Sequence, residues 1–98
     1  VLLAGSEGRR ALPVDSPDHL VLDYAPHGAL FPAASVIVHS GGIGTLAQAL
    51  RSGRPQLVVP FGFDQPDNAR RTARLGVGAV LPIARYTATR AETLLLDL

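Results

Sequence analysis

The strongest constraint on the fold is an apolar, β-branched run that ends at a glycine turn and leads into an amphipathic helix. Residues 35–39, Ser-Val-Ile-Val-His, contain neither Gly nor Pro, which is typical of a strand buried on both faces of a parallel sheet. Residues 41–44, Gly-Gly-Ile-Gly, end the strand, and residues 45–52 place apolar side chains on one helical face. This strand–turn–helix unit predicts an α/β fold.

The remaining sequence repeats the alternation of strands and helices. The expected strands are residues 1–4, 19–24, 56–60 and 77–81, and the expected helices are residues 27–34, interrupted near Pro32, residues 66–75, and residues 88–96, where the chain end truncates the helix. Residues 5–18 are polar and show no period, so they predict a loop. The alternation predicts a doubly wound parallel sheet, in which ligands bind beyond the carboxyl ends of the strands.

Composition excludes several classes of function. The chain of 98 residues has no Cys, which excludes disulfides, thiolate catalysis and Cys-ligated zinc, and its three His and eight acidic residues do not pair at metal-ligand spacing. A net charge of +1 without a clustered basic surface argues against nucleic acid as a partner. No apolar run approaches the ~18 residues that a membrane span needs, and we expect a cytoplasmic protein. Because the sequence contains no Met, we expect it to be a piece of a longer protein.

The glycine turn has the chemistry of a phosphate site. The start of a helix offers unpaired N–H groups and a partial positive charge, and glycines let the backbone approach an anion closely. Thr45 can add a hydroxyl, and His39 a ring N–H, to phosphate oxygens. The alternative is a tight turn that needs glycines for its geometry alone.

A dinucleotide site is a second interpretation of the same turn. Residues 42–47, Gly-Ile-Gly-Thr-Leu-Ala, fit the G-x-G-x-x-A fingerprint, and Asp64 follows Gly44 by 20 residues. Against this, Asp64 lies in a loop beyond the strand tip, and two expected strands precede the turn, whereas a nicotinamide fingerprint normally lies on the first strand. A nicotinamide-dependent oxidoreductase is therefore kept as the alternative from another enzyme class.

A polar segment follows the neighbouring strand. In residues 61–68, Phe-Gly-Phe-Asp-Gln-Pro-Asp-Asn, a carboxylate stands beside an amide, and together they can accept and donate hydrogen bonds to vicinal sugar hydroxyls. The alternative is helix capping, in which Asp64, Gln65 or Asp67 serves the N–H groups around Pro66.

Three motifs in order resemble a known family. Residues 39–45, His-Ser-Gly-Gly-Ile-Gly-Thr, residues 53–60, Gly-Arg-Pro-Gln-Leu-Val-Val-Pro, and residues 64–69, Asp-Gln-Pro-Asp-Asn-Ala, resemble the donor-binding half of family 1 nucleotide-sugar glycosyltransferases of the GT-B fold. The resemblance covers residues 20–82 well and is greatest to bacterial members that act on natural products, lipids or sterols. It implies that residues 1–98 are a partial C-terminal nucleotide-sugar-binding domain of a two-domain hexosyltransferase.

The resemblance also implies roles for individual residues. The donor diphosphate would be bound by His39, Gly41, Gly42, Gly44 and Thr45, and the transferred sugar by Asp64 and Gln65. Base or ribose contacts are implied for Tyr24, Ala25 and His27, which match a stretch where plant relatives have Trp-Ala-Pro-Gln, and for Gln48. The alternative for Tyr24 is a strand-end aromatic packed under the loop. Where the plant pattern has a ribose-binding Glu, this chain has Ala47 with Gln48 beside it, so the preferred base and ribose are not predicted.

The implied reaction is inverting transfer without a metal or other cofactor. An acceptor hydroxyl attacks the anomeric carbon of a UDP-sugar or dTDP-sugar as the nucleoside diphosphate leaves, stabilised by the helix start and His39. The family's general base and acceptor pocket lie in its N-terminal domain, so no catalytic residue is implied within residues 1–98, and the fragment alone is expected to be inactive. The implied partners are the donor and a small-molecule, lipid or sterol acceptor, with peripheral membrane contact of the full-length protein. A sugar-nucleotide epimerase half-domain is a further alternative.

The resemblance finally implies a Rossmann-like sheet that is incomplete. The family's C-terminal domain begins with a central strand that ends in Gly-Ser, and we expect this chain to start at the second strand and to lack both the central strand and the C-terminal helix. Without the central strand, two half-sheets, residues 1–24 and 35–82, either pair directly or stay apart.

Overall fold

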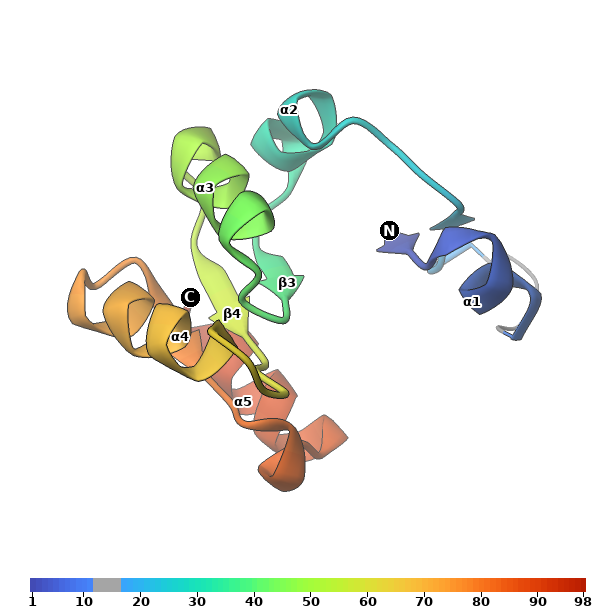
Figure 1. The fold of residues 1–98 in the computed structure, drawn as a ribbon. Coiled ribbons are helices and arrows are strands. Elements are labelled where there is room, and N and C mark those ends of the chain that lie inside the picture. The colour runs from blue at the N-terminus through green and yellow to red at the C-terminus, as the bar shows by residue number, and fades with distance from the viewer. Residues whose placement is uncertain (12–16) are drawn as a thin grey trace.

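The computed structural model describes residues 1–11 and 17–98, which fold as alternating strands and helices (Figure 1). In chain order these elements are β1 (Leu2–Leu3), α1 (Gly5–Ala11), β2 (Val21–Leu22), α2 (His27–Leu30), β3 (Ile37–His39), α3 (Ile43–Ser52), β4 (Gln56–Val58), α4 (Gln65–Arg74), β5 (Gly78–Val80) and α5 (Ala88–Asp97). Short 3₁₀ segments, Phe31–Ala33 and Ile83–Arg85, follow α2 and β5. Each strand and helix predicted from residue 19 onward corresponds to one of these elements.

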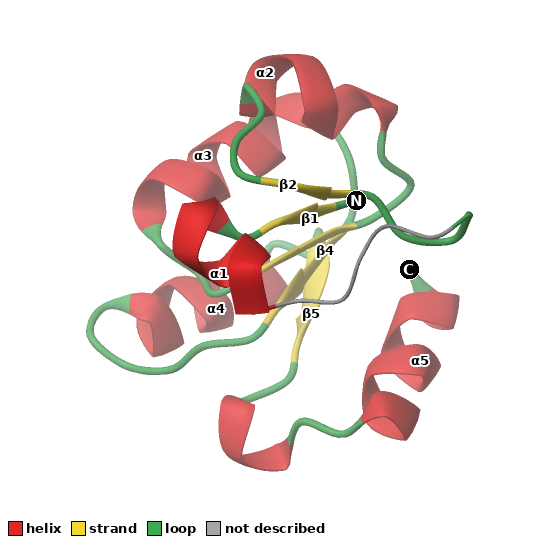
Figure 2. Ribbon diagram, turned by 90° about the vertical axis from the view of Figure 1, so that its right-hand side faces the viewer, coloured by secondary structure: helices red, strands yellow, loops and turns green. Residues whose placement is uncertain are grey.

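The strands form two separate parallel sheets within the described residues. β1 pairs with β2, and the second sheet has the order β3-β4-β5, with Ile37 opposite Gln56 and Gln56 opposite Gly78. In Figure 2, α5 lies on one side of the strands and α3 and α4 lie on the other. The prediction of a doubly wound parallel α/β fold is confirmed, and the two expected half-sheets stay apart.

Between the two strands of the first half-sheet, the chain forms a helix where the sequence predicts a loop. Residues 5–11 form α1, so the loop prediction is wrong there, and residues 12–16 of that prediction lie outside the described residues. Gly5, at φ +69°, turns the chain from β1 directly into α1, and Glu7 in the first turn complements the helix dipole. Because α1 is short and contains two glycines, it has no apolar period by which the sequence could indicate it.

The two faces of the second sheet have separate cores. On one face, Leu57 packs with residues that include Ala91 of α5, and on the other, Ile37 packs with Phe31 and Ala49 of the α2–α3 region. Side chains alternate along a strand, so the neighbours of Leu57, among them Gln56, point toward the α3 side. His39, two residues after Ile37, shares that side.

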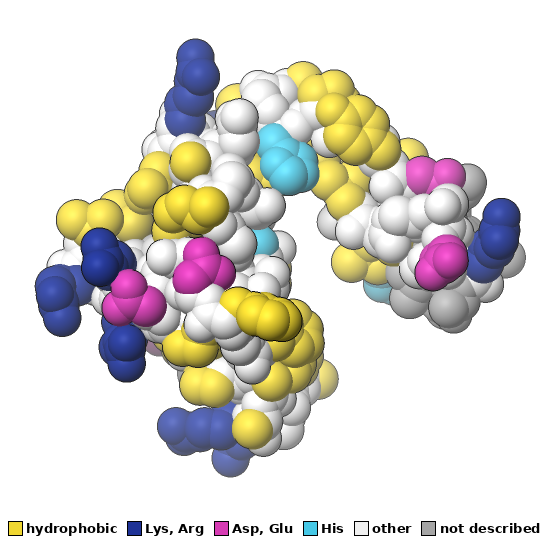
Figure 3. All heavy atoms as spheres, viewed as in Figure 1, with side chains coloured by type: hydrophobic (Ala, Val, Ile, Leu, Met, Phe, Trp, Pro, Cys, Tyr) yellow, Lys and Arg dark blue, Asp and Glu magenta, His cyan; other side chains and the backbone are white. Residues whose placement is uncertain are grey.

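Within the described residues, β1 and β3 each have one edge that pairs with no other strand. Apolar side chains beside these edges are exposed: Leu2 by 47%, Leu3 by 36% and Val38 by 50%. Figure 3 shows an open hollow between the first half-sheet with α1 and the rest of the molecule. Among the described residues, no helix is long and apolar enough to cross a membrane.

Candidate functional site

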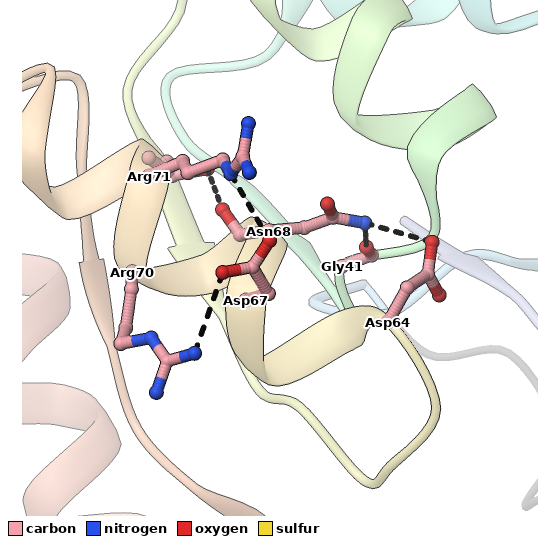
Figure 4. A network of polar contacts seen from close by, with 7 residues as sticks. Gly41, Asp64, Asp67, Asn68, Arg70 and Arg71 are labelled. Atoms are coloured by element: carbon pink, nitrogen blue, oxygen red, sulfur yellow. Dashed lines mark hydrogen bonds and ion pairs between the residues drawn. The ribbon is translucent and has the colours of Figure 1, made fainter.

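The residues predicted to bind the diphosphate and the sugar lie in two adjacent turns. β3 and β4 are neighbouring parallel strands, so the turns after them leave the sheet at the same edge. Asn68, in the first turn of α4, joins these turns: its Nδ2 donates to the carbonyl oxygen of Gly41 at 2.9 Å and to Oδ2 of Asp64 at 3.1 Å (Figure 4). Asn68 is buried, so this amide holds the glycine turn and Asp64 together. Asn68 lies in the third of the motifs that resemble the family, but its position in the sequence alone indicates no role for it.

Gly41 and Gly42 shape the start of α3 in different ways. Gly41 has φ +98°, and a Cβ placed on it would lie 3.0 Å from Cγ1 of Val58 and 3.2 Å from the carbonyl oxygen of Gln65. Both its conformation and its close approach to neighbouring atoms therefore require glycine. Gly42 is the N-cap of α3, and no side chain of the described residues caps this helix. The first-turn N–H groups, which an α-helix leaves unpaired, are therefore available to an anion.

His39 is hydrogen-bonded at both ring nitrogens. Its Nδ1 accepts from the N–H of Gly41 at 3.0 Å, so the neutral ring carries its proton on Nε2, which donates to Oε1 of Gln56 at 2.7 Å. Burial lowers the pKa of His39 from its ordinary value of 6.5, outweighing the Gln56 bond, which raises it, and His27 adds a small lowering. The His39 ring is therefore neutral at about pH 7. In this arrangement the N–H of Gly41 points at the imidazole and is not part of the open helix start.

Asp64 and Gln65 stand at the start of α4, but neither caps it. Asp64 occupies the N-cap position, but its side chain accepts no bond from a backbone N–H of the helix. Its exposed carboxylate accepts from the side-chain amide of Asn68. Oε1 of Gln65 accepts from two N–H groups of the preceding loop, at 2.9 and 3.3 Å. Asp67 pairs with two arginines on the exposed face of α4, at 3.3 and 3.0 Å. The capping interpretation is therefore wrong, and the Asp64 carboxylate is accessible to a polar ligand.

Two of the four residues with implied base or ribose roles line one cavity. His27 and Gln48 border an open cavity of about 390 Å³ between α2 and α3, together with Gly28, Pro32, Arg51 and Ser52. The His27 ring stacks on Phe31 with a centroid distance of 4.4 Å, which fixes it in the cavity wall. The structure thus brings residues from two separate segments to one concave surface.

The other two residues, Tyr24 and Ala25, do not line this cavity. Tyr24 is 76% exposed, so the alternative that it packs under the loop is wrong. Its ring is free to cover a ligand but contributes nothing to the core.

Two arginines near the end of α3 were missed by the sequence analysis. Arg51 lines the cavity one helical turn beyond Gln48, and this i,i+3 spacing could have indicated it. Arg54 donates from Nε at 3.0 Å and from Nη2 at 2.7 Å to the carbonyl oxygen of Pro32 and so tethers the cavity wall. The cavity therefore has a positive charge at its rim. Among the described residues, no group of three or more His, Cys, Asp or Glu side chains could hold a metal ion.

Comparison with known proteins matches nearly the whole chain. A family model described as "Erythromycin biosynthesis protein CIII-like, C-terminal domain" matches residues 2–97. O-mycaminosyltylonolide 6-deoxyallosyltransferase from Streptomyces fradiae is 42% identical over 86 residues, which are 87% of this chain and 19% of that protein. Vancomycin aglycone glucosyltransferase from Amycolatopsis orientalis is 38% identical over 78 residues, which are 80% of this chain and 19% of that protein. The chain thus spans less than a quarter of the length of these relatives.

Solved structures of glycosyltransferases have the same fold. The glycotransferase of kitacinnamycin superposes with a TM-score of 0.81 at 31% identity, over 91% of this chain and 24% of that one. The glycosyltransferase VinC, solved in complex with DTDP, superposes with a TM-score of 0.79 at 32% identity, over 91% of this chain and 23% of that one.

Proposed function

Since the chain belongs to the erythromycin biosynthesis protein CIII-like C-terminal domains, within the family 1 glycosyltransferases of the GT-B fold, we propose that it binds the nucleotide-sugar donor of such an enzyme. The donor is a UDP-sugar or a dTDP-sugar. The DTDP in the VinC complex supports a nucleoside diphosphate as the ligand of a related site.

The observation that carries this proposal is the bridge formed by Asn68. It joins an uncapped helix start, which suits a diphosphate, to an accessible carboxylate at Asp64, which suits sugar hydroxyls. The diphosphate needs hydrogen-bond donors and the sugar hydroxyls need an acceptor, and the two adjacent turns offer one of each. In this proposal Gly42, Gly44 and Thr45 surround the diphosphate, while Asp64 and Gln65 receive the sugar.

The cavity lined by His27 and Gln48 supplies the place for the nucleoside. Its volume of about 390 Å³ lies within the ~300–1,000 Å³ range of small-molecule sites. The stacked His27 ring offers an aromatic face to the base, and the Gln48 amide can bond ribose hydroxyls. Tyr24 and the backbone of Ala25 approach the base from outside the cavity.

The reaction of the full-length enzyme is inverting transfer to an acceptor hydroxyl without a metal ion. The helix start of α3 neutralises the leaving diphosphate, which is the task a divalent cation would otherwise perform. The acceptor pocket and the general base lie in another domain, so residues 1–98 alone do not transfer the sugar. The acceptor is a small molecule, lipid or sterol.

Calorimetric titration of the chain with dTDP, UDP, thymidine, uridine and NAD tests the proposal. We expect binding of a nucleoside diphosphate, weaker binding of its nucleoside and no binding of NAD. His39→Ala removes the ring that accepts the N–H of Gly41 and holds the glycine turn. This variant is expected to weaken diphosphate binding by at least about fivefold, the equivalent of one neutral hydrogen bond, and to change nucleoside binding much less. Binding of NAD without binding of UDP or dTDP would overturn the proposal in favour of an oxidoreductase domain.

A further inference from the structure

Gln56 is a polar side chain in a place where an apolar one is the rule. It lies in β4, the central strand of the three-stranded sheet, and is 0% exposed. Its Nε2 has no hydrogen-bond partner among the described residues. A buried, unpaired amide destabilises a fold, so stability does not explain the presence of Gln56.

The other end of the Gln56 amide makes a short bond to the candidate site. Oε1 accepts the Nε2–H of His39 at 2.7 Å, while Nδ1 of the same ring accepts the N–H of Gly41 at 3.0 Å. Because the two bonds leave one place for the ring proton, they select the same tautomer. They also form a continuous connection from the centre of the sheet to the glycine turn.

The acceptor at Gln56 is itself fixed in space. Its strand is paired on both sides, with Gln56 opposite Ile37 of β3 and Gly78 of β5. A Cβ on Gly78 would collide with the backbone of Gln56, so the two strands are held at close approach by a glycine. A hydrogen bond to this amide therefore orients His39 against the rigid part of the fold.

We propose that Gln56 is a positioning residue, which holds His39 as the Nε2–H tautomer in a single ring orientation and so keeps the turn at Gly41 in the shape that leaves the start of α3 open. The inference about the tautomer and ring orientation of His39 does not depend on the proposed function. The inference about diphosphate binding rests on the proposed function.

Nitrogen-15 NMR of the His39 ring tests the first part. We expect the unmodified chain to show the Nε2–H tautomer with a ring proton that exchanges slowly with water, because the proton is donated to a buried oxygen. Gln56→Met, which removes the acceptor, is expected to lose that proton signal, and Gln56→Glu, which keeps an acceptor oxygen, to retain it. Thr72→Val is the matched control: Thr72 is also buried, but its hydroxyl donates to the carbonyl oxygen of Asn68, so the His39 signal is expected to persist.

A double-mutant cycle tests the second part. We expect Gln56→Met to weaken dTDP or UDP binding by about fivefold, the equivalent of one neutral hydrogen bond. In a chain that already carries His39→Ala, Gln56→Met is expected to have no further effect, because Gln56 acts through His39.

The outcomes separate the two ideas. An unchanged His39 ring signal in Gln56→Met overturns the positioning role, and so does an equal loss of affinity with and without His39. If Gln56→Met does not fold, loss of the ring signal in Gln56→Glu, which keeps the acceptor, overturns the role. A further outcome is that the NMR signal of the His39 ring changes as expected while neither the unmodified chain nor any variant binds a nucleoside diphosphate. In that case the positioning role stands and the proposed function fails.

Discussion

Replacing Gly41 with Ala is expected to destabilise the domain strongly. The residue has φ +98°, a region that costs a side-chain-bearing residue about 1–3 kcal/mol. The new methyl group would also lie 3.0 Å from Cγ1 of Val58 and 3.2 Å from the carbonyl oxygen of Gln65. Such overpacking typically costs about 1–3 kcal/mol. The sum, about 2–6 kcal/mol, is a large part of the ~5–15 kcal/mol that stabilises a domain.

Gly44→Ala is the matched control in the same turn. Gly44 lies inside α3, and the space around its missing side chain is open. An alanine there is expected to stabilise the helix by about 0.5–1 kcal/mol, while its methyl group obstructs the proposed diphosphate position.

Thermal unfolding followed by circular dichroism measures both variants. At about 4–8 °C per kcal/mol for a chain of this size, Gly41→Ala is expected to lower the melting temperature by at least about 8 °C and Gly44→Ala to raise it by a few degrees. Titration with dTDP or UDP then separates the two effects, because Gly44→Ala is expected to bind diphosphate more weakly despite its higher stability. A Gly41→Ala domain as stable as the unmodified one would refute the reasoning, because the turn could not then have the close packing described above.

Replacing Asp64 or Gln65 with Ala in a full-length enzyme is expected to lower turnover and to relax the choice of sugar, while the affinity for free diphosphate stays within about twofold of normal. Normal kinetics with a lowered melting temperature would contradict this prediction. Burial lowers the pKa of His39 from 6.5, so the stability contributed by the neutral ring is complete above that pH and is lost as the pH falls below it. His39→Asn is therefore expected to flatten the melting-temperature profile between about pH 7 and about pH 5, and an unchanged slope would argue against it. Because the outer edge of β3 pairs with no other described strand, the isolated chain is expected to associate, and Val38→Lys is expected to reduce that association in light scattering. A cooperative unfolding transition of a monomer, with a melting temperature raised by UDP, would show that the two half-sheets need no further strand.

The sequence alone determined the order of elements from residue 19 onward and indicated where a candidate site lies. Strands such as residues 35–39 are recognisable because a buried parallel strand must be continuously apolar, and the helix after them because glycine and proline mark its ends. The topological rule for parallel sheets then directs attention to the residues after each strand. The sequence did not predict the helix at residues 5–11, because this segment has no apolar periodicity and the helix begins at the turn made by Gly5.

Only the tertiary structure decided which polar groups face one another. Spacing could not show that Asn68 bridges Gly41 and Asp64, or that Asp64 does not cap its own helix, because both depend on how two strands align. Nor could it show that Gln56 engages His39, a contact between residues 17 positions apart. Local sequence limits the conformations of a segment, whereas a hydrogen bond between segments needs the register of β3 against β4, which packing of the whole sheet sets.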